Sequence, residues 1–402
     1  MLAVLAPGQG SQKPGFLAPW LDLPGTEARL RWWSALAGTD LVHLGTNADA
    51  DEIRDTAKTQ PLLVSAALLA AEHLHPAELA GHSVVVAGHS VGELAAAAIA
   101  GVLTSETAVT FAAVRGREMA AACAVEPTGL SAVLGGDADE VTAAIETAGL
   151  YAANRNGAGQ IVAAGSVAAL ESFAAAPPAK TRVIALQVAG AFHTPYMAPA
   201  EKALAALAGG ITPATPRRIL LSNADGSAVA DGATMLSRLV AQVTAPVRFD
   251  LCLRTLADLG VTGIVELPPA GTLAGLAKRE LPTLKARLAG SPTSVEIVTV
   301  NTPDDLKAAR DLIARHAIAP SHEPTMDFVL AVATVAGSFE PLPDLDEGTH
   351  IKAGQVLGHI VTRQGNAEVT AHDSGRLVEW LAHHSDPVSP GQPLARIGGD
   401  SL

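Results

Sequence analysis

Short runs of apolar residues alternate with longer stretches of helical periodicity over the first 316 residues of the chain. This alternation predicts an α/β fold, in which buried parallel strands lie between helices. The expected strands are residues 1–6, 84–88, 218–223, 263–267 and 295–300. The expected helices are residues 62–74, 92–98, 105–122, 234–243, 273–279 and 303–316, and a further helix opens at 246–249.

A different pattern interrupts this unit at residues 126–192. Strands are expected at 131–134, 160–165 and 182–188, and helices at 139–148 and 168–175. We assign these elements to the β-α-β-β-α-β order of the ferredoxin-like arrangement. The predicted fold is therefore a hydrolase-like parallel-sheet domain, residues 1–125 and 193–316, with an inserted ferredoxin-like subdomain.

The last part of the chain, residues 317–402, lacks the alternation of strands and helices found before it. Residues 317–325 have the composition of a linker, and residues 326–402 predict a second unit of short strands. Residues 351–360, IKAGQVLGHI, match residues 388–397, VSPGQPLARI, which indicates an internal half-repeat. We therefore expect a separate all-β domain at residues 326–402.

Composition excludes several classes of function. The chain is 49% hydrophobic and has a formal net charge of -13, which disfavours nucleic acid or an anionic membrane as a partner. Cys123 and Cys252 have no metal-ligand spacing and indicate neither a disulfide framework nor a metal site. The apolar run at residues 1–6 is too short for a signal sequence, so a cytoplasmic location is expected.

A serine between two glycines follows the second expected strand. Residues 88–92 read Gly-His-Ser-Val-Gly, the pattern in which a sharp turn between strand and helix exposes a nucleophilic hydroxyl. At the start of a helix, unpaired N–H groups and the helix dipole stabilise negative charge. Ser90 is therefore the candidate nucleophile.

His193 is the candidate base for this serine. It lies in a loop of small residues after the strand at 182–188, where an imidazole can face a cleft. No acidic residue with comparable context lies between Ser90 and His193, and a backbone carbonyl could orient the imidazole instead. We therefore expect a Ser-His dyad.

Three further positions stay ambiguous when only their local sequence is considered. Arg115 lies in the expected helix 105–122, where an arginine is usually a solvated surface residue. Gln60 precedes Pro61 and is expected at the N-terminus of helix 62–74. The N–H of Gln9 belongs to a glycine-rich loop that either points into a site or simply leaves the first strand.

Taken together, seven motifs resemble the malonyl-CoA:acyl carrier protein transacylase family over residues 1–316. They are PGQGSQ at 7–12, QP at 60–61, GHSVGE at 88–93, RG at 115–116, NxN with GQ at 154–160, GAFH at 190–193 and VELPPAG at 265–271. The resemblance implies ping-pong transfer of malonyl from malonyl-CoA to the phosphopantetheine thiol of a holo-acyl carrier protein. It implies no bound cofactor, and a place in fatty acid or polyketide synthesis.

The resemblance also implies roles for individual residues. Ser90 would accept the acyl group, His193 would act as its base, and the N–H groups of Gln9 and Val91 would form the oxyanion hole. Arg115 would bind the free carboxylate of the malonyl group. The other substrate-binding positions implied are Gln60, Phe192, Asn154 and Asn156.

Two positions deserve comparison with the family pattern. Phe192 resembles the phenylalanine that accompanies malonyl specificity in the family's acyltransferase domains, where serine accompanies methylmalonyl. Ala245 stands where many relatives have asparagine, and the resemblance implies that its main-chain carbonyl holds His193.

The paired turns of residues 326–402 resemble the biotinyl/lipoyl-carrier fold. Such carriers present a modifiable lysine at a hairpin tip, but the corresponding hairpin, residues 361–369, contains none. Lys352, the tail's only lysine, belongs to a half-repeat turn instead. We therefore expect a structural or docking module with a partner of its own. The acidic balance of this tail argues against direct capture of an acidic carrier protein.

Two alternative functions remain open at this point. A serine hydrolase would use the same nucleophile and base to release the acyl group to water. A synthase scaffold would instead act through residues 326–402.

Overall fold

The computed structural model describes residues 1–74, 84–286, 294–316, 328–363 and 365–398. The expected α/β fold with a parallel sheet is confirmed: in the described part of the chain, five parallel strands run in the order β10-β9-β1-β2-β7. They are β1 (Leu2–Ala6), β2 (Val84–Gly88), β7 (Ile219–Leu220), β9 (Gly263–Glu266) and β10 (Glu296–Thr299). The predicted linker at 317–325 lies outside the described residues.

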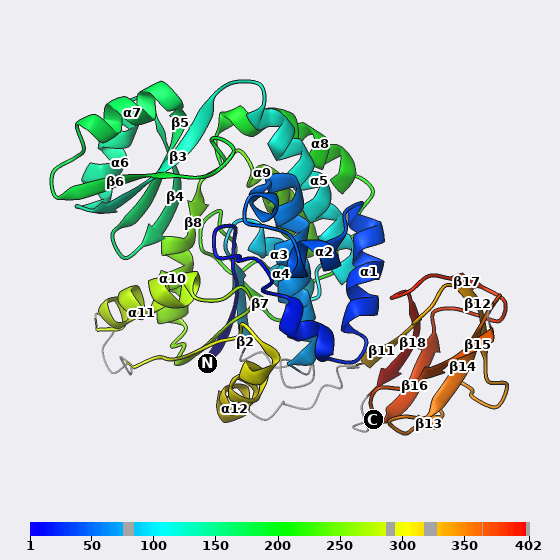
Figure 1. Ribbon diagram of the computed structural model, residues 1–402. Helices are drawn as coiled ribbons and strands as arrows, with labels where there is room; N and C mark the ends of the chain where they lie inside the picture. Colours follow the sequence, from blue (N-terminus) through cyan, green and yellow to red (C-terminus); the bar gives the residue numbers. More distant parts are fainter. Residues whose placement is uncertain (75–83, 287–293, 317–327, 364, 399–402) are drawn as a thin grey trace.

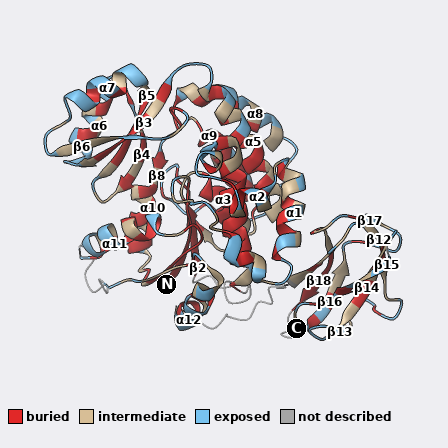
Figure 2. Cartoon of the chain, viewed as in Figure 1, coloured by how far each residue is buried: buried red, intermediate tan, exposed pale blue. Residues whose placement is uncertain are grey.

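Both faces of the central strand β1 are covered. Leu2 and Val4 join the hydrophobic core on one face of the sheet, whereas Ala3 and Leu5 join the core on the other. Figure 2 shows helix α3 buried over most of its length. The helices of the first core are α1 (Thr26–Ala37), α2 (Leu41–Thr46), α3 (Thr56–His73), α4 (Gly92–Ile99), α5 (Ser105–Cys123), α8 (Ala198–Ala208), α9 (Gly232–Ala241) and α12 (Leu306–His316). Those of the second are α10 (Phe249–Asp258) and α11 (Thr272–Lys285).

Four short 3-10 turns join these elements. They are η1 (Ala18–Asp22), η2 (Glu52–Arg54), η3 (Pro195–Met197) and η4 (Pro303–Asp305). In the part of the chain that the structure describes, no helix combines the length and the apolar character needed to span a bilayer.

Helix α3 begins earlier than the sequence pattern predicts. The Asp55 side chain accepts a hydrogen bond from the Ala57 N–H and caps the helix at Thr56. The prediction that Gln60 stands at the helix N-terminus is therefore wrong, since Gln60 and Pro61 lie inside the helix and are buried. Gln60 is thereby presented from a rigid helix interior.

The insertion forms a second sheet, in the order β6-β3-β5-β4-β8 (Figure 1). Its elements follow the β-α-β-β-α-β order: β3 (Thr128–Gly135), α6 (Ala138–Thr147), β4 (Tyr151–Gly157), β5 (Gln160–Ser166), α7 (Val167–Ala175) and β6 (Thr181–Leu186). The predicted ranges did not include β4, which contains the polar run Asn154-Arg155-Asn156 and no β-branched residue.

The fifth strand of this sheet, β8 (Val247–Arg248), comes from the parallel-sheet part of the chain. It pairs in parallel with β4, with Asn154 opposite Val247 and Arg155 opposite Arg248. The prediction that a helix opens at 246–249 is corrected, because α10 begins only at Phe249.

The tail forms two four-stranded sheets around its own apolar core. Its strands are β11 (Phe328–Val332), β12 (Gly337–Pro341), β13 (His350–Ile351), β14 (Val356–Thr362), β15 (Gly365–Thr370), β16 (Gly375–Trp380), β17 (Pro387–Val388) and β18 (Pro393–Gly398). The sheet orders are β11-β18-β16-β13 and β15-β14-β12-β17. If β11–β14 are replaced in turn by β15–β18, and β15–β18 by β11–β14, the strand order of one sheet becomes that of the other.

Two glycines allow the backbone to pack tightly where β2 meets α4. A Cβ at Gly88 would collide with the backbone of Gly92 and Glu93, and a Cβ at Gly92 would collide with the carbonyl oxygens of Ala6 and Pro7. The turn between them therefore lies directly against the end of β1.

We predict that Gly92→Ala destabilises the protein by about 1–3 kcal/mol, because the new methyl group has no space. Urea denaturation measures the change. Gly275→Ala is the matched control, since Gly275 also lies in a helix but its Cβ would meet only the Arg279 side chain, at 3.5 Å. There alanine should stabilise by about 0.5–1 kcal/mol through helix propensity. Equal effects of both substitutions would contradict the packing argument.

Candidate active site

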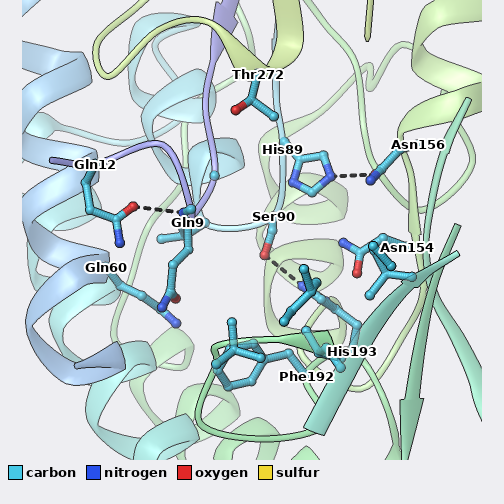
Figure 3. A pocket seen from close by; sticks show the side chains of 18 of the residues that line it. Gln9, Gln12, Gln60, His89, Ser90, Asn154, Asn156, Phe192, His193 and Thr272 are labelled. Atoms are coloured by element: carbon cyan, nitrogen blue, oxygen red, sulfur yellow. Dashed lines mark hydrogen bonds between the residues drawn. The ribbon is translucent and has the colours of Figure 1, made fainter. Parts of the chain in front are cut away.

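Ser90 occupies the sharp turn between β2 and α4. Its φ of 52° is in the left-handed region, which costs free energy in a residue other than glycine and marks the turn as strained. The Ser90 N–H donates to Asn223 Oδ1 at 2.8 Å, which fixes the backbone of this turn. The hydroxyl oxygen lies 2.7 Å from His193 Nε2 (Figure 3).

The other ring nitrogen of His193 is held by the backbone. Nδ1 lies 2.7 Å from the carbonyl oxygen of Gln242, where it donates a hydrogen bond and leaves Nε2 free to accept from Ser90. The expected carbonyl was that of Ala245. The structure corrects this assignment: the Gln242 carbonyl makes the hydrogen bond, and the Ala245 carbonyl has only a smaller effect on the ring.

Burial sets the protonation state of His193. The side chain is 4% exposed, and loss of water together with the nearby Arg115 cation lowers its pKa from 6.5 to about 3. The imidazole is therefore neutral at physiological pH and can accept a proton.

Arg115 is a buried cation and not a solvated surface residue. It is 1% exposed, and its guanidinium donates to Gln60 Oε1 at 2.7 Å, to Gln242 Oε1 at 2.9 Å and to the Ser90 hydroxyl at 3.2 Å. Burial lowers the pKa of Arg115 to about 10, so it stays charged at neutral pH. Among the described residues, no carboxylate forms a salt bridge with it.

Two backbone donors belong to residues that line the cavity around Ser90. Gln9, in the loop after β1, and Val91, at the start of α4, both line the cavity that contains Ser90. Within the described ranges of the chain, neither N–H has a hydrogen-bond partner. Both are therefore available to an oxygen of a ligand.

The cavity lies between the parallel-sheet part and the inserted sheet, and its volume is ≈ 560 Å³. Asn154 and Asn156 reach it from β4, and Phe192 from the loop that precedes His193 (Figure 3). Asn156 Oδ1 lies 2.8 Å from His89 Nε2, so a hydrogen bond joins the two walls. Of the predicted site residues, all but Ala245 line this cavity. The lining residues among them are Gln9, Gln60, Ser90, Val91, Arg115, Asn154, Asn156, Phe192 and His193.

Sequence reasoning assigned no role to three residues next to this cavity. Gln242 and Asn223 hold His193 and Ser90, and Met119 lies against Gln60, whose Nε2 is 3.4 Å from its sulfur. Glu93 belongs to the GHSVGE motif but was given no function, although it is 1% exposed. Burial raises the pKa of Glu93 to about 7.

Comparisons with known proteins identify the family. Residues 5–315 match the family model described as acyl transferase domain. Over 297 residues the chain is 57% identical to malonyl CoA-acyl carrier protein transacylase of Mycobacterium tuberculosis, covering 74% of this chain and 98% of that protein. The chain belongs to this transacylase family. The transacylase of Escherichia coli K12 is 32% identical over 300 residues, covering 73% of this chain and 97% of that protein.

Solved structures support the same membership. The crystal structure of MCAT from Mycobacterium tuberculosis superposes with a TM-score of 0.72 at 54% identity, covering 77% of this chain and 99% of that one. A structure of a type II PKS acyl-carrier protein in complex with its malonyl-transacylase gives a TM-score of 0.69 at 27% identity, covering 77% of this chain and 99% of that one. The match to the transacylase family model ends at residue 315, before the tail.

The low pKa of His193 generates a prediction about the reactivity of Ser90. Because the folded-state pKa is about 3, His193 stays neutral well below pH 6, where Glu93 with its pKa of about 7 is already protonated. The rate at which a neutral fluorophosphonate probe labels Ser90 should therefore stay flat from about pH 5.5 to about pH 4.5 when followed by intact mass, with Ser90→Ala as the unlabelled control. A fall of about tenfold over that one pH unit, as expected for a base with an ordinary histidine pKa, would contradict the buried, neutral imidazole.

Proposed function

We propose that this chain transfers malonyl from malonyl-CoA to the phosphopantetheine thiol of a holo-acyl carrier protein. The observation that carries the proposal is the buried Arg115 guanidinium, 3.2 Å from the Ser90 hydroxyl and without a carboxylate partner among the described residues. A site built this way favours an acyl group that ends in a carboxylate. The malonyl-CoA:acyl carrier protein transacylases to which the chain is similar support the same substrate.

The first half of the reaction follows from the Ser90–His193 geometry. Ser90 Oγ attacks the thioester carbonyl while His193 Nε2 takes the hydroxyl proton. The N–H groups of Gln9 and Val91 stabilise the oxyanion of the tetrahedral intermediate. The carbon–sulfur bond then breaks, His193 returns the proton to the departing CoA sulfur, and malonyl remains on Ser90 as an ester.

The second half is the same sequence in reverse. The thiol of the carrier protein gives its proton to His193 and attacks the malonyl ester, and the Ser90 oxygen leaves and recovers a proton from His193. No redox change or additional cofactor is needed. CoA leaves before the carrier protein reacts, which makes the kinetics ping-pong.

Arg115 supplies the selectivity of the proposed site. A malonyl carboxylate loses its hydration when it enters the site. A guanidinium that donates two parallel hydrogen bonds to the carboxylate offsets this cost. Gln60 holds the opposite edge of the guanidinium through its Oε1 atom. Phe192 fills space beside the acyl group, so that an added methyl is disfavoured by about 1–3 kcal/mol. Asn154 and Asn156 complete the wall on the subdomain side.

The tail has a separate proposed role. The first four strands of the tail take the same places in one sheet as the last four take in the other, and the reverse. This equivalence supports the twofold relation of a biotinyl/lipoyl-like domain. The β14–β15 hairpin, where such carriers present their lysine, has none in its sequence. We therefore propose a docking module and not a prosthetic-group carrier.

Transfer and hydrolysis are distinguished by following the fate of the malonyl group. Radiolabelled malonyl-CoA with a holo-acyl carrier protein should give malonyl carrier protein well in excess of free malonate, and intact mass should detect a malonyl-enzyme in its absence. Ser90→Ala should abolish the adduct, because among the residues that the structure describes Ser90 is the hydroxyl paired with His193. Release of malonate without transfer would favour the serine hydrolase alternative.

Removal of residues 317–402 tests the role of the tail. The tail has its own apolar core, so the truncated protein should stay folded and transfer malonyl at an unchanged rate in vitro. Association with a synthase partner should be lost when it is measured by co-purification against the full chain. A large loss of transfer with no loss of association would contradict the docking role and favour a part of the tail in catalysis.

A further inference from the structure

Three buried polar side chains form a continuous chain behind the proposed malonyl site. Arg115 donates to Gln242 Oε1 at 2.9 Å, and Gln242 Nε2 donates to Glu93 Oε2. All three residues are at most 5% exposed. The Arg115 guanidinium and the Glu93 carboxyl group, which is about half ionised at pH 7 because its pKa is about 7, are thus joined through one neutral amide. The amide oxygen faces Arg115 and the amide nitrogen faces Glu93.

Position 93 is surrounded by hydrogen-bond donors. The Asn223 N–H donates to Glu93 Oε1 at 2.5 Å, the Gln242 amide donates to Oε2, and the Ser222 hydroxyl also bonds to the carboxylate. A carboxylate can accept all of these hydrogen bonds, whereas a glutamine would turn an NH2 group toward at least one donor. The local geometry therefore requires an acidic residue there.

The distance between the two charges matters for substrate binding. A carboxylate in direct contact with Arg115 would occupy the guanidinium that the substrate needs. A buried guanidinium without any compensating charge would be strongly destabilising. Placing the Glu93 carboxyl group one amide away lets its ionised form compensate the charge while the guanidinium stays open toward Ser90.

The same amide also reaches the nucleophile and the base. Gln242 Nε2 lies 3.1 Å from the Ser90 carbonyl oxygen, and the Gln242 carbonyl accepts from His193 Nδ1. The orientation of this one residue thus affects the position of Arg115 relative to the reacting hydroxyl.

We propose that Glu93 is a positioning and specificity-determining residue, which acts through the Gln242 amide to hold Arg115 open for the carboxylate of the acyl group. Glu93 itself does not line the cavity and does not touch substrate. This inference rests on the proposed malonyl transfer and adds a second determinant of its selectivity.

Glu93→Gln tests the role of the carboxylate. The new NH2 group must face either the Asn223 N–H or the Gln242 amide. In the second case the Gln242 amide must rotate, which turns its nitrogen toward Arg115 and removes its hydrogen bond to the Ser90 carbonyl. We expect kcat/KM for acylation by malonyl-CoA to fall about 10- to 100-fold, mainly through KM, because a hydrogen bond to a charged group is lost. Acylation by acetyl-CoA should fall less than acylation by malonyl-CoA, because it loses the Ser90 contact but makes no carboxylate contact with the guanidinium. Arg115→Ala sets the scale for complete loss of malonyl preference.

The double variant Glu93→Gln with Gln242→Glu tests the spacing of the charges. It keeps the side-chain volumes, the total charge and a donor–acceptor pair between positions 93 and 242, but it places the carboxylate directly on Arg115. The carbonyl that holds His193 is unaffected because it belongs to the backbone. We expect this variant to fold and to lose the malonyl-to-acetyl preference at least as far as Glu93→Gln.

Glu266→Gln is the matched control for removing a buried carboxylate. Glu266 is 0% exposed, and the donors to it among the described residues are the backbone N–H groups of Gly271, Leu273 and Ala274. It should lower the melting temperature and leave the ratio of malonyl to acetyl acylation unchanged.

Several outcomes would overturn the inference. An unchanged malonyl-to-acetyl ratio in the double variant would show that the spacing does not matter, and equal loss of both acylation rates in Glu93→Gln would indicate a merely structural role. Failure of both variants to fold, seen by circular dichroism, would also assign Glu93 to stability alone. The wild-type chain is assayed first, and absence of its malonyl adduct would refute the proposed function. If the wild-type chain forms the adduct and the variants keep its preference for malonyl over acetyl, only this inference is refuted.

Discussion

A buried positive charge without a directly bound anion is the constraint on which the rest of the site depends. Arg115 is removed from water and surrounded by the neutral oxygens of Gln60, Gln242 and Ser90. Burial of an unpaired ion costs several kcal/mol. Hydrogen bonds to Gln60 and Gln242 hold the guanidinium in place, and the Glu93 carboxyl group lies one amide behind it.

The protonation states in this region follow from the same constraint. The charge of Arg115 adds to burial in lowering the pKa of His193, which keeps the base neutral without an acidic partner. An aspartate in contact with His193, as in a catalytic triad, would add a second anion within reach of the guanidinium. A backbone carbonyl orients the imidazole without that competition, and this gives a physical reason for a dyad beside a cationic pocket.

Much of this arrangement could be predicted from the sequence, and the failures have identifiable causes. The serine turn and the parallel sheet were predictable because glycine spacing and apolar runs are local signals. An arginine in a helix is usually solvated, so the local sequence indicated a surface position for Arg115. Only the family resemblance indicated that Arg115 lies in the substrate pocket. Gln242 was missed because its contribution to His193 comes from a carbonyl, which every residue possesses. β4 was missed because its alternating asparagines lack the β-branched residues that mark strands. The domain boundaries at 126–192 stay a prediction.

The short strand β8 has a consequence for how the pocket can change shape. Only four residues separate Gln242, which holds the base, from Val247, which pairs with Asn154 on the opposite wall. The insertion is therefore anchored to the catalytic centre through a covalent tether as well as through the His89–Asn156 hydrogen bond. The position of the subdomain wall and the orientation of His193 are thus connected through residues 242–247, so we expect a displacement of this wall to shift the imidazole relative to Ser90.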